Sequence, residues 1–242
     1  MQKKIGMFGF ADKTEFLICL AKTLTIMDKK VLLFDATLND KLKYAIPAFN
    51  YKEKQSIIHY DGIDFAVGYN DFSIVNESVC TGTSSVDDYD FIIVDVDTPE
   101  RLQNLSDVEF SKLYFVMQQN TESLIRNREL LDYIVETYND VTKNVEMTKI
   151  HFKTFMTRAG EQYYNARYAE YDVNWNSNIY EIPYNEQDNM AAVDSQLAGY
   201  IDMSRHSKQF TTLVTDLASE LLVDVNANDI RKALKLYIRR SM

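Results

Sequence analysis

Two short apolar runs, each closed by an aspartate, constrain the fold of this chain most strongly. Residues 31–35 read VLLFD, and residues 89–95 read YDFIIVD. Strands that are apolar on both faces are typical of parallel sheets, because helices must cover both sides. Segments with helical spacing of apolar residues alternate with such runs, at 15–27, 121–138, 208–222 and 227–240. The alternation predicts an α/β fold, a mostly parallel doubly wound sheet with helices on both faces.

Further strands complete the expected sheet. We expect them at 5–9, at 112–117, near 149–155 and at 179–182. A hairpin is predicted from strands 56–60 and 63–67, which an Asp-Gly turn joins at Asp61 and Gly62. The 242 residues suit one α/β domain at 1–225, followed by a basic amphipathic helix at 226–242.

The composition indicates an ordinary globular protein of acidic character. Apolar residues make up 46% and charged residues 26% of the chain, and the net charge of −10 does not favour nucleic acid as a partner. No apolar run reaches the roughly 18 residues of a membrane span. A strand follows the first residues directly, so we expect no signal peptide and a cytoplasmic location.

Residues 3–16 predict a strand, a tight loop and the start of a helix. The loop, at 9–14, reads GFADKT and ends in Lys-Thr, as in phosphate-binding loops, where these two residues reach phosphate and magnesium. Ligands of parallel sheets bind beyond the carboxyl ends of the strands. Asp35 and Asp95 close strands at that edge, where a carboxylate can hold magnesium opposite a phosphate loop.

These elements together resemble the ParA/MinD family of deviant Walker A ATPases, including relatives of the TadZ/CpaE type that place pilus machinery. Residues 5–24 resemble the first strand, loop and helix of the family, and 30–35 its second strand with the terminal aspartate. The run YDFIIVDVDTP at 89–99 resembles its Walker B strand, and IPYN at 182–185 the segment that borders the base. The resemblance implies nucleotide contacts from Gly9, Phe10, Ala11, Asp12, Lys13, Thr14, Asp35, Asp95 and Pro183. It implies magnesium contacts from Thr14 and Asp95.

The loop departs from the family pattern in ways that argue against efficient ATP binding. The family loop is close to KGGxGKT, and its first lysine reaches the nucleotide of a dimer partner; this chain has no such lysine. Glycines in the family loop let phosphate approach the backbone N–H groups closely. This chain keeps only Gly9 of them, and Phe10 and Ala11 add side chains in the space that phosphate would occupy.

An aspartate stands where the last glycine of the loop is expected. Asp12 and Glu15 fit a capping box, in which the Asp12 carboxylate would occupy the helix N–H groups that phosphate needs. At about 4 Å and an effective dielectric of 20, it would oppose each phosphate charge by roughly 4 kcal/mol. We hypothesise that Asp12 acts as a built-in phosphate mimic.

Three interpretations of this site remain open. In the first, Lys13 and Thr14 have no function beyond a solvated first turn of the helix. In the second, the site binds nucleotide weakly without efficient turnover. In the third, it is a competent ATPase. We expect no cofactor under the first interpretation, and ATP with magnesium under the other two. Asp35 and Asp95 follow the same alternatives, because their roles depend on a nucleotide.

The last predicted helix is basic and amphipathic. Residues 230–242 hold five basic and no acidic side chains. Such a helix can lie on anionic lipid, bind a partner or fold onto its own domain. Its position resembles the membrane-targeting helix of MinD. The candidate membrane or partner contacts are Ile230, Leu234, Tyr237, Ile238, Arg239 and Arg240.

Other residue groups give weaker signals. The aromatic stretch at 162–184 indicates either a partner or dimer face or local packing. The three histidines, His59, His151 and His206, are expected to be structural. Cys19 and Cys80 lack metal-ligand spacing, and Cys19 is expected to be a buried, reduced thiol. Neither a GxSxG elbow nor a GxGxxG motif after the first strand is present.

Two hypotheses of function follow. The first is a non-catalytic ParA/MinD-like protein that binds partner proteins and positions or assembles a larger machine, such as a pilus, secretion, conjugation or partition apparatus. The second is an ATPase of the same family, whose nucleotide drives dimerisation and membrane or partner binding. The resemblance also implies a homodimer.

Overall fold

The computed structural model describes residues 2–47, 55–80, 85–105, 107–137, 146–154 and 158–241. Within these ranges the side chains of residues 76, 78–80, 153, 154, 240 and 241 are not described.

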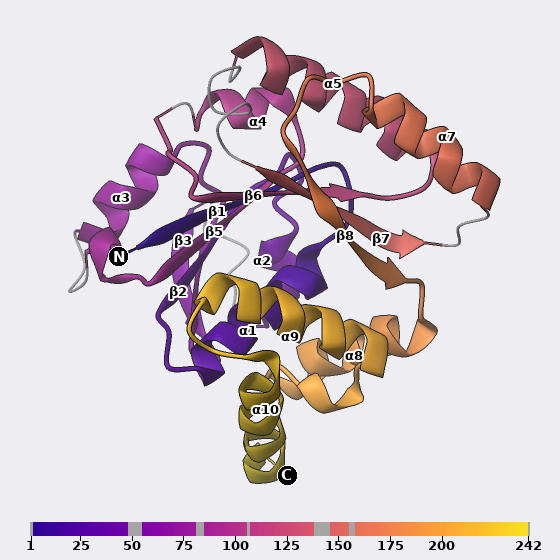
Figure 1. Ribbon diagram of the computed structural model, residues 1–242. Helices are drawn as coiled ribbons and strands as arrows, with labels where there is room; N and C mark the ends of the chain where they lie inside the picture. The colour runs from indigo at the N-terminus through magenta and orange to yellow at the C-terminus, as the bar shows by residue number, and fades with distance from the viewer. Residues whose placement is uncertain are drawn as a thin grey trace.

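One eight-stranded sheet runs through the molecule in the order β3-β4-β2-β5-β1-β6-β7-β8 (Figure 1). All neighbouring strands pair in parallel except β3 and β4, which pair antiparallel. The strands are β1 (Lys3–Phe8), β2 (Val31–Ala36), β3 (Ser56–Tyr60), β4 (Ile63–Val67), β5 (Phe91–Val96), β6 (Lys112–Met117), β7 (Met147–Thr154) and β8 (Trp175–Pro183). The predicted mostly parallel sheet is confirmed.

Helices cover both faces of the sheet, as the apolar strands require (Figure 1). One face carries α1 (Thr14–Ile26), α2 (Leu42–Ala45), α8 (Glu186–Ala198), η2 (Met203–Arg205), α9 (Lys208–Leu222) and α10 (Ala227–Ser241). The other carries α3 (Phe72–Cys80), η1 (Val86–Asp88), α4 (Pro99–Gln103), α5 (Thr121–Thr137) and α7 (Arg158–Tyr168).

The two hydrophobic cores follow the alternation of side chains along the strands. In β2, Leu33 faces the core under α1 and α9, whereas Leu32 and Phe34 face the core under α5. Every residue of β2 and of β5 is buried. These two strands are neighbours in the interior of the sheet, and so their aspartates lie side by side at its carboxyl edge.

The predicted hairpin is confirmed, with Tyr60 paired to Ile63 across the turn. The sequence analysis missed α2, α3, α4, α7 and α8. Three of these are short, and α8 has weak amphipathic character, because its exposed face carries apolar side chains.

The aromatic stretch at 162–184 serves largely as local packing. Tyr168 is buried, and Tyr164, Tyr171 and Trp175 pack against the core under α5. Tyr163 and Tyr184 are exposed.

Helix α10 shares a core with the rest of the molecule. Its Ile230 and Leu234 are buried in the same cluster as the apolar side chains of α1 and α9. In the described part of the chain, no helix combines the length and apolar character needed to cross a bilayer.

Candidate functional site: the carboxyl edge of the central strands

The central strands bring the loop at 9–14 and the two strand-terminal aspartates together. β5 lies between β2 and β1, and its Asp95 is in register with Asp35 on one side and with Met7 on the other. The loop leaves β1 two residues after Met7. The fold therefore brings the residues that the sequence predicts for a phosphate-binding site to one point of the sheet edge.

Lys13 turns into the protein instead of toward solvent. Its Nζ lies 2.6 Å from Asp95 Oδ1, and the two side chains are 0% and 4% exposed. The same ammonium donates to the carbonyl oxygens of Gly9 at 2.7 Å and Val96 at 3.5 Å. The expectation that Lys13 belongs to a solvated first turn is therefore wrong, because its ammonium is directed into the sheet edge.

Burial governs the electrostatics of Asp95. Loss of solvent raises the pKa of this carboxyl to about 7, with Lys13 opposing the rise and Asp35 adding to it. The pair thus holds a carboxylate that gains a proton near neutral pH.

Asp35 has a structural role in the loop that follows β2. Its Oδ1 accepts from the backbone N–H of Thr37 at 3.0 Å and from the Thr37 hydroxyl at 2.6 Å, and its Oδ2 accepts from the N–H of Leu42 at 2.8 Å. Burial raises the pKa of Asp35, and these hydrogen bonds counteract the rise. Asp97 holds the same loop by accepting from the N–H of Leu38 at 2.9 Å.

The start of the loop requires glycine. Gly9 has φ +119, and a Cβ there would lie 2.1 Å from the carbonyl oxygen of Val116. The loop backbone passes this close to β6, and only glycine permits the approach. Gly9 is thus explained by packing, independently of phosphate.

The first three N–H groups of the loop already have partners. Gly9 N donates to Val96 O at 3.0 Å, and Ala11 N donates to Gly9 O at 3.1 Å. Phe10 N donates to Asn127 Oδ1 at 2.6 Å, and the hydroxyl of Ser123 donates to Phe10 O at 2.8 Å. Asn127 and Ser123 are buried on α5, and so this helix fixes the loop from the opposite face.

Asp12 does not form the predicted capping box. Helix α1 begins at Thr14, its N-cap is Lys13, and no side chain caps it. Asp12 Oδ1 makes a long contact with Thr14 N, at 3.4 Å, and its Oδ2 lies 3.5 Å from Lys41 Nζ. Glu15, the expected second member of the box, instead contacts His206. The Asp12 side chain is 58% exposed, and solvent therefore screens it more than a dielectric of 20 assumes.

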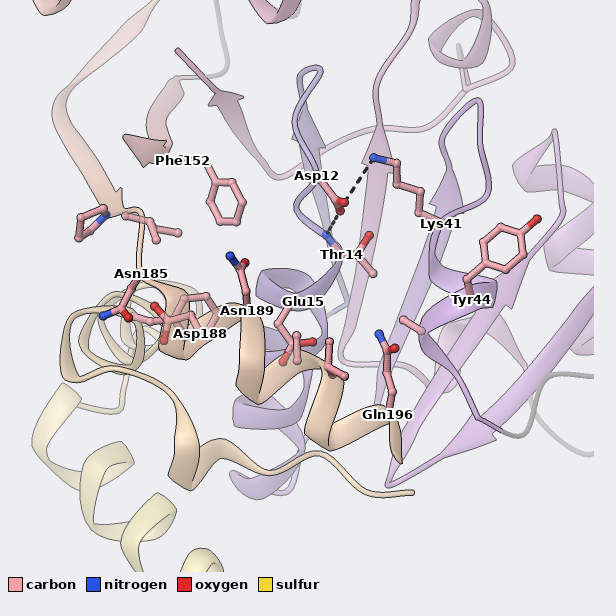
Figure 2. Close-up of a pocket in the computed structure, with 16 residues that line it drawn as sticks. Asp12, Thr14, Glu15, Lys41, Tyr44, Phe152, Asn185, Asp188, Asn189 and Gln196 are labelled. Atoms are coloured by element: carbon pink, nitrogen blue, oxygen red, sulfur yellow. Dashed lines mark hydrogen bonds and ion pairs between the residues drawn. The ribbon is translucent and has the colours of Figure 1, made fainter. Parts of the chain in front are cut away.

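A cleft of about 460 Å³ opens beside the end of the loop (Figure 2). It lies between the start of α1, the segment around Lys41 and Tyr44, the end of β8 and helix α8. Figure 2 shows Asp12 between Thr14 and Lys41 at one end of the cleft, with Asn185 and Asp188 at the other. Its charged lining residues are Asp12, Glu15, Asp188 and Lys41.

The structure divides the predicted nucleotide residues into two groups. Asp12, Thr14 and Pro183 line the cleft. Lys13, Asp35 and Asp95 are buried behind it, engaged with one another or with the backbone. Of the predicted magnesium pair, Thr14 lines the cleft, while Asp95 pairs with Lys13.

The candidate contacts on α10 divide similarly. Ile230 and Leu234 are buried, and Lys22 Nζ lies 4.6 Å from the centre of the Tyr237 ring. Ile238 is half-buried and Arg239 is exposed, whereas the side chain of Arg240 lies outside the described residues. The first two turns of α10 therefore fold onto the body of the protein.

The sequence analysis missed Ser123 and Asn127, as well as the contact of Glu15 with His206. A polar pair four residues apart on a helix is a faint signal. Its partner lies more than a hundred residues away in the chain, and a single sequence carries no information on such a distance.

Solved structures with the same architecture include ParA/MinD-type P-loop NTPases. A plasmid partition protein of Borrelia burgdorferi B31 bound to AMPPNP superposes with a TM-score of 0.63 and 14% identity, covering 93% of this chain and 99% of its own. A ParA family ATPase of Chlorobium tepidum TLS gives 0.62 and 16%, covering 90% and 97%. A chain of the MinC:MinD cell division protein complex of Aquifex aeolicus gives 0.59 and 14%, covering 93% and 97%.

No protein-family model matches the sequence, and no curated protein matches it either. At these identities the likeness defines the fold: this chain has the ParA/MinD-type P-loop architecture over most of its length.

Proposed function

We propose that this protein is a non-catalytic member of the ParA/MinD type, whose former nucleotide site has become a structural element. It binds partner proteins and positions or assembles a larger cytoplasmic or membrane-associated machine of the pilus, secretion, conjugation or partition kind. TadZ/CpaE-like proteins are the relatives that such a role resembles. The observation that carries the proposal is the buried ion pair between Lys13 and Asp95.

The ion pair occupies the Lys13 ammonium and the Asp95 carboxylate, the two groups that would bind phosphate and magnesium in a phosphate-binding site. A lysine that binds phosphate must present its ammonium beyond the sheet edge, and an aspartate that binds magnesium must present its carboxylate there. Here each neutralises the other at 2.6 Å. Separating them to admit a nucleotide would leave two charges to be resolvated or paired again, which costs several kcal/mol for groups this deeply buried.

The charges of the cleft also oppose a nucleotide. Its lining carries the acids Asp12, Glu15 and Asp188 and the single base Lys41. A triphosphate entering this cleft meets more negative than positive charge. Magnesium would have to offset that excess without Asp95.

Exposed apolar side chains beside the cleft support a protein partner. Met190, Val193 and Leu197 are 67%, 54% and 81% exposed along one side of α8. Tyr44, which lines the cleft together with Val193, is 72% exposed. The occupant that we propose for this surface is a second copy of the chain, because ParA/MinD relatives dimerise across their nucleotide face. A Leu197→Glu variant should lower the mass measured by light scattering from dimer to monomer. Ile125→Glu, at an exposed site on α5, should not; a wild-type monomer would contradict this part of the proposal.

The second candidate function is an ATPase whose nucleotide drives dimerisation and membrane or partner binding. The observation that favours it is the cleft itself, which Thr14 and Pro183 line beside the loop. A neighbour of this fold was solved with AMPPNP bound. This function requires Lys13 to leave Asp95 when nucleotide arrives.

Calorimetry with magnesium-ATP and magnesium-AMPPNP separates the two functions. We expect no heat of binding for the full-length protein and no phosphate release above buffer. Asp12→Gly should leave both results unchanged, because Asp12 is exposed and does not close the site. Micromolar affinity that Lys13→Ala abolishes, together with phosphate release above buffer, would establish the ATPase instead.

Membrane contact through α10 is a further part of the proposal. Because Ile230 and Leu234 belong to the core, deleting the helix would disturb the fold, and point changes are the sharper test. Flotation with anionic vesicles should decrease for a Lys235→Glu, Arg239→Glu variant, since both side chains are exposed. Equal flotation of the variant and the wild type would remove lipid as a partner of α10.

A further inference from the structure

Three side chains with metal-binding atoms meet under the cleft, away from the Lys13–Asp95 pair. They are Glu15 and Cys19 of α1 and His206, which lies between η2 and α9. His206 Nε2 lies 2.9 Å from Glu15 Oε1 and 3.7 Å from Cys19 Sγ. Cys19 Sγ lies 3.4 Å from Glu15 Oε1. Among the described residues, this is the group of His, Cys and acidic side chains close enough to hold one ion.

The fold brings the three donors together from two separate parts of the chain. Glu15 and Cys19 are four residues apart on α1, and so their side chains project from the same side of the helix. His206 is held from α8, because Asp188 accepts from the N–H of Ser207 at 2.6 Å and from its hydroxyl at 2.9 Å. The imidazole stacks on Phe210, with ring centres 4.7 Å apart. The histidine is therefore presented to α1 by a rigid support.

The separations are close to those of a tetrahedral zinc site. Zinc bonds of about 2.3 Å to sulfur and about 2.0–2.2 Å to nitrogen and oxygen place neighbouring ligand atoms about 3.4–3.6 Å apart. Two of the three observed separations, 3.7 and 3.4 Å, lie within a few tenths of an ångström of this range. The third, 2.9 Å, is a hydrogen bond between Glu15 and His206 that would open by about half an ångström.

The donor set selects the class of metal. Thiolate, imidazole and carboxylate together suit zinc, whereas magnesium and calcium take oxygen ligands almost exclusively. Cys19 and His206 are buried, but the Glu15 side chain is 20% exposed and lines the cleft. An ion therefore has a path to the cluster, and its fourth position would face the cleft. Asp12 and Asp188 on the same lining favour the approach of a cation.

We propose that Glu15, Cys19 and His206 form a zinc site with three protein ligands and a fourth position open to the cleft. Binding replaces the thiol proton of Cys19 with the metal and releases that proton to solvent. His206 then coordinates through Nε2 and carries its ring proton on Nδ1. Burial raises the pKa of Cys19, and the metal-free protein therefore carries the thiol. The bound ion ties α1, directly after the loop, to the segment that begins α9. Neither a nucleotide nor the dimer proposed above is needed to form this site.

Metal titration of the full-length protein, stripped with chelator and kept reduced, tests the site. We expect one equivalent of zinc per chain, and with cobalt the ultraviolet charge-transfer band that requires a thiolate ligand. Cys19→Ser and His206→Gln should each weaken zinc binding at least about 100-fold. Cys80→Ser and His59→Gln are the matched controls, and both should bind zinc as the wild type does.

The outcomes that overturn the proposal are equally definite. Absence of stoichiometric zinc in the wild type, or a cobalt spectrum without the thiolate band, removes the site. Loss of that band in Cys80→Ser would identify Cys80 as the thiolate ligand. Unchanged zinc affinity in Cys19→Ser would likewise assign the thiolate to Cys80 and not to Cys19. If the ligand variants do not fold, the band retained in Cys80→Ser still identifies Cys19. Zinc, but not magnesium, should then raise the unfolding temperature of the wild type.

Discussion

The ammonium of Lys13 lies 2.6 Å from the carboxylate of Asp95, and both side chains are withdrawn from solvent. A lysine and an aspartate at the positions of a phosphate loop and a Walker B strand thus form a structural ion pair. The pair connects the start of α1 to the end of β5, two elements that meet at the centre of the sheet edge.

Removing one partner of this pair should destabilise the protein strongly. At pH 8, above the pKa of Asp95, Lys13→Met leaves the Asp95 carboxylate buried without its counter-charge, and we expect a loss of about 3–5 kcal/mol in the free energy of unfolding. Adding Asp95→Asn to Lys13→Met should recover much of that loss, because no charge then remains uncompensated. Urea denaturation of the four proteins measures the coupling. A cost below about 1 kcal/mol for Lys13→Met, as for a surface lysine, would contradict the buried pair.

Asp95 should give stability a definite pH dependence. Its folded pKa, about 7, lies above the ordinary value of 3.8, and the unfolded chain therefore loses this proton first as pH rises. The stabilisation from the protonated form is complete below about pH 4 and is lost as pH rises through about 7. Relative to Asp95→Asn, the wild type should lose on the order of 2–3 kcal/mol between pH 5 and pH 8. Denaturant melts at both pH values measure this loss. A free energy of unfolding that rises with pH would mean that the charge of Lys13, and not burial, sets the pKa of Asp95.

Gly9→Ala should be far more damaging than an ordinary glycine substitution. The new Cβ would lie 2.1 Å from the Val116 carbonyl at φ +119, and neither backbone can yield cheaply. We expect a cost above about 3 kcal/mol from strain and overpacking. Gly199→Ala is the control, because Gly199 also has positive φ but no atom lies within 4 Å of the point that its Cβ would occupy. Thermal unfolding should show a cost of only about 1 kcal/mol there, and equal costs would refute the steric argument.

Asn127 should hold the loop through its contact with the N–H of Phe10. Asn127→Ala removes the acceptor at 2.6 Å and leaves that N–H without its side-chain partner. We expect a loss of about 1–3 kcal/mol and faster hydrogen exchange of the Phe10 amide. Asn104→Ala, at an exposed position after α4, should change neither quantity. Unchanged exchange at Phe10 in Asn127→Ala would mean that the loop is fixed by other contacts.

Helix α10 offers a test of how firmly it belongs to the body. Ile230 is 0% exposed and Leu236 is 54% exposed on the same helix. Ile230→Asp buries an unpaired carboxylate, and we expect it to cost at least about 3 kcal/mol. Leu236→Asp should change the free energy of unfolding by no more than about 0.5 kcal/mol. Two equally mild effects in calorimetric melts would show that α10 detaches from the core.

The alternation of apolar strands and amphipathic helices was enough to predict the sheet. Residues 31–35 and 89–95 lie in or lead into β2 and β5, and the Asp-Gly turn at 61 and 62 joins β3 to β4. Each of these signals is local, because side-chain period and turn chemistry are properties of neighbouring residues. The expectation that the loop at 9–14, Asp35 and Asp95 share one edge followed from the rule that ligands bind beyond the carboxyl ends of parallel strands. The strand order that makes them neighbours, β2-β5-β1, came from the structure.

The state of that site was decided only by tertiary structure. The sequence did not reveal that Lys13 turns inward to Asp95, that Asn127 binds the loop, or that His206 meets Cys19. Each contact joins residues far apart in the chain, and its energy depends on burial, which the fold creates after the local elements have formed. The sequence by itself therefore determined the architecture, a mostly parallel sheet with the loop at 9–14 at its carboxyl edge. Tertiary packing decided that Lys13 faces the core. A buried ammonium needs a buried partner of opposite charge, and Asp95 supplies it.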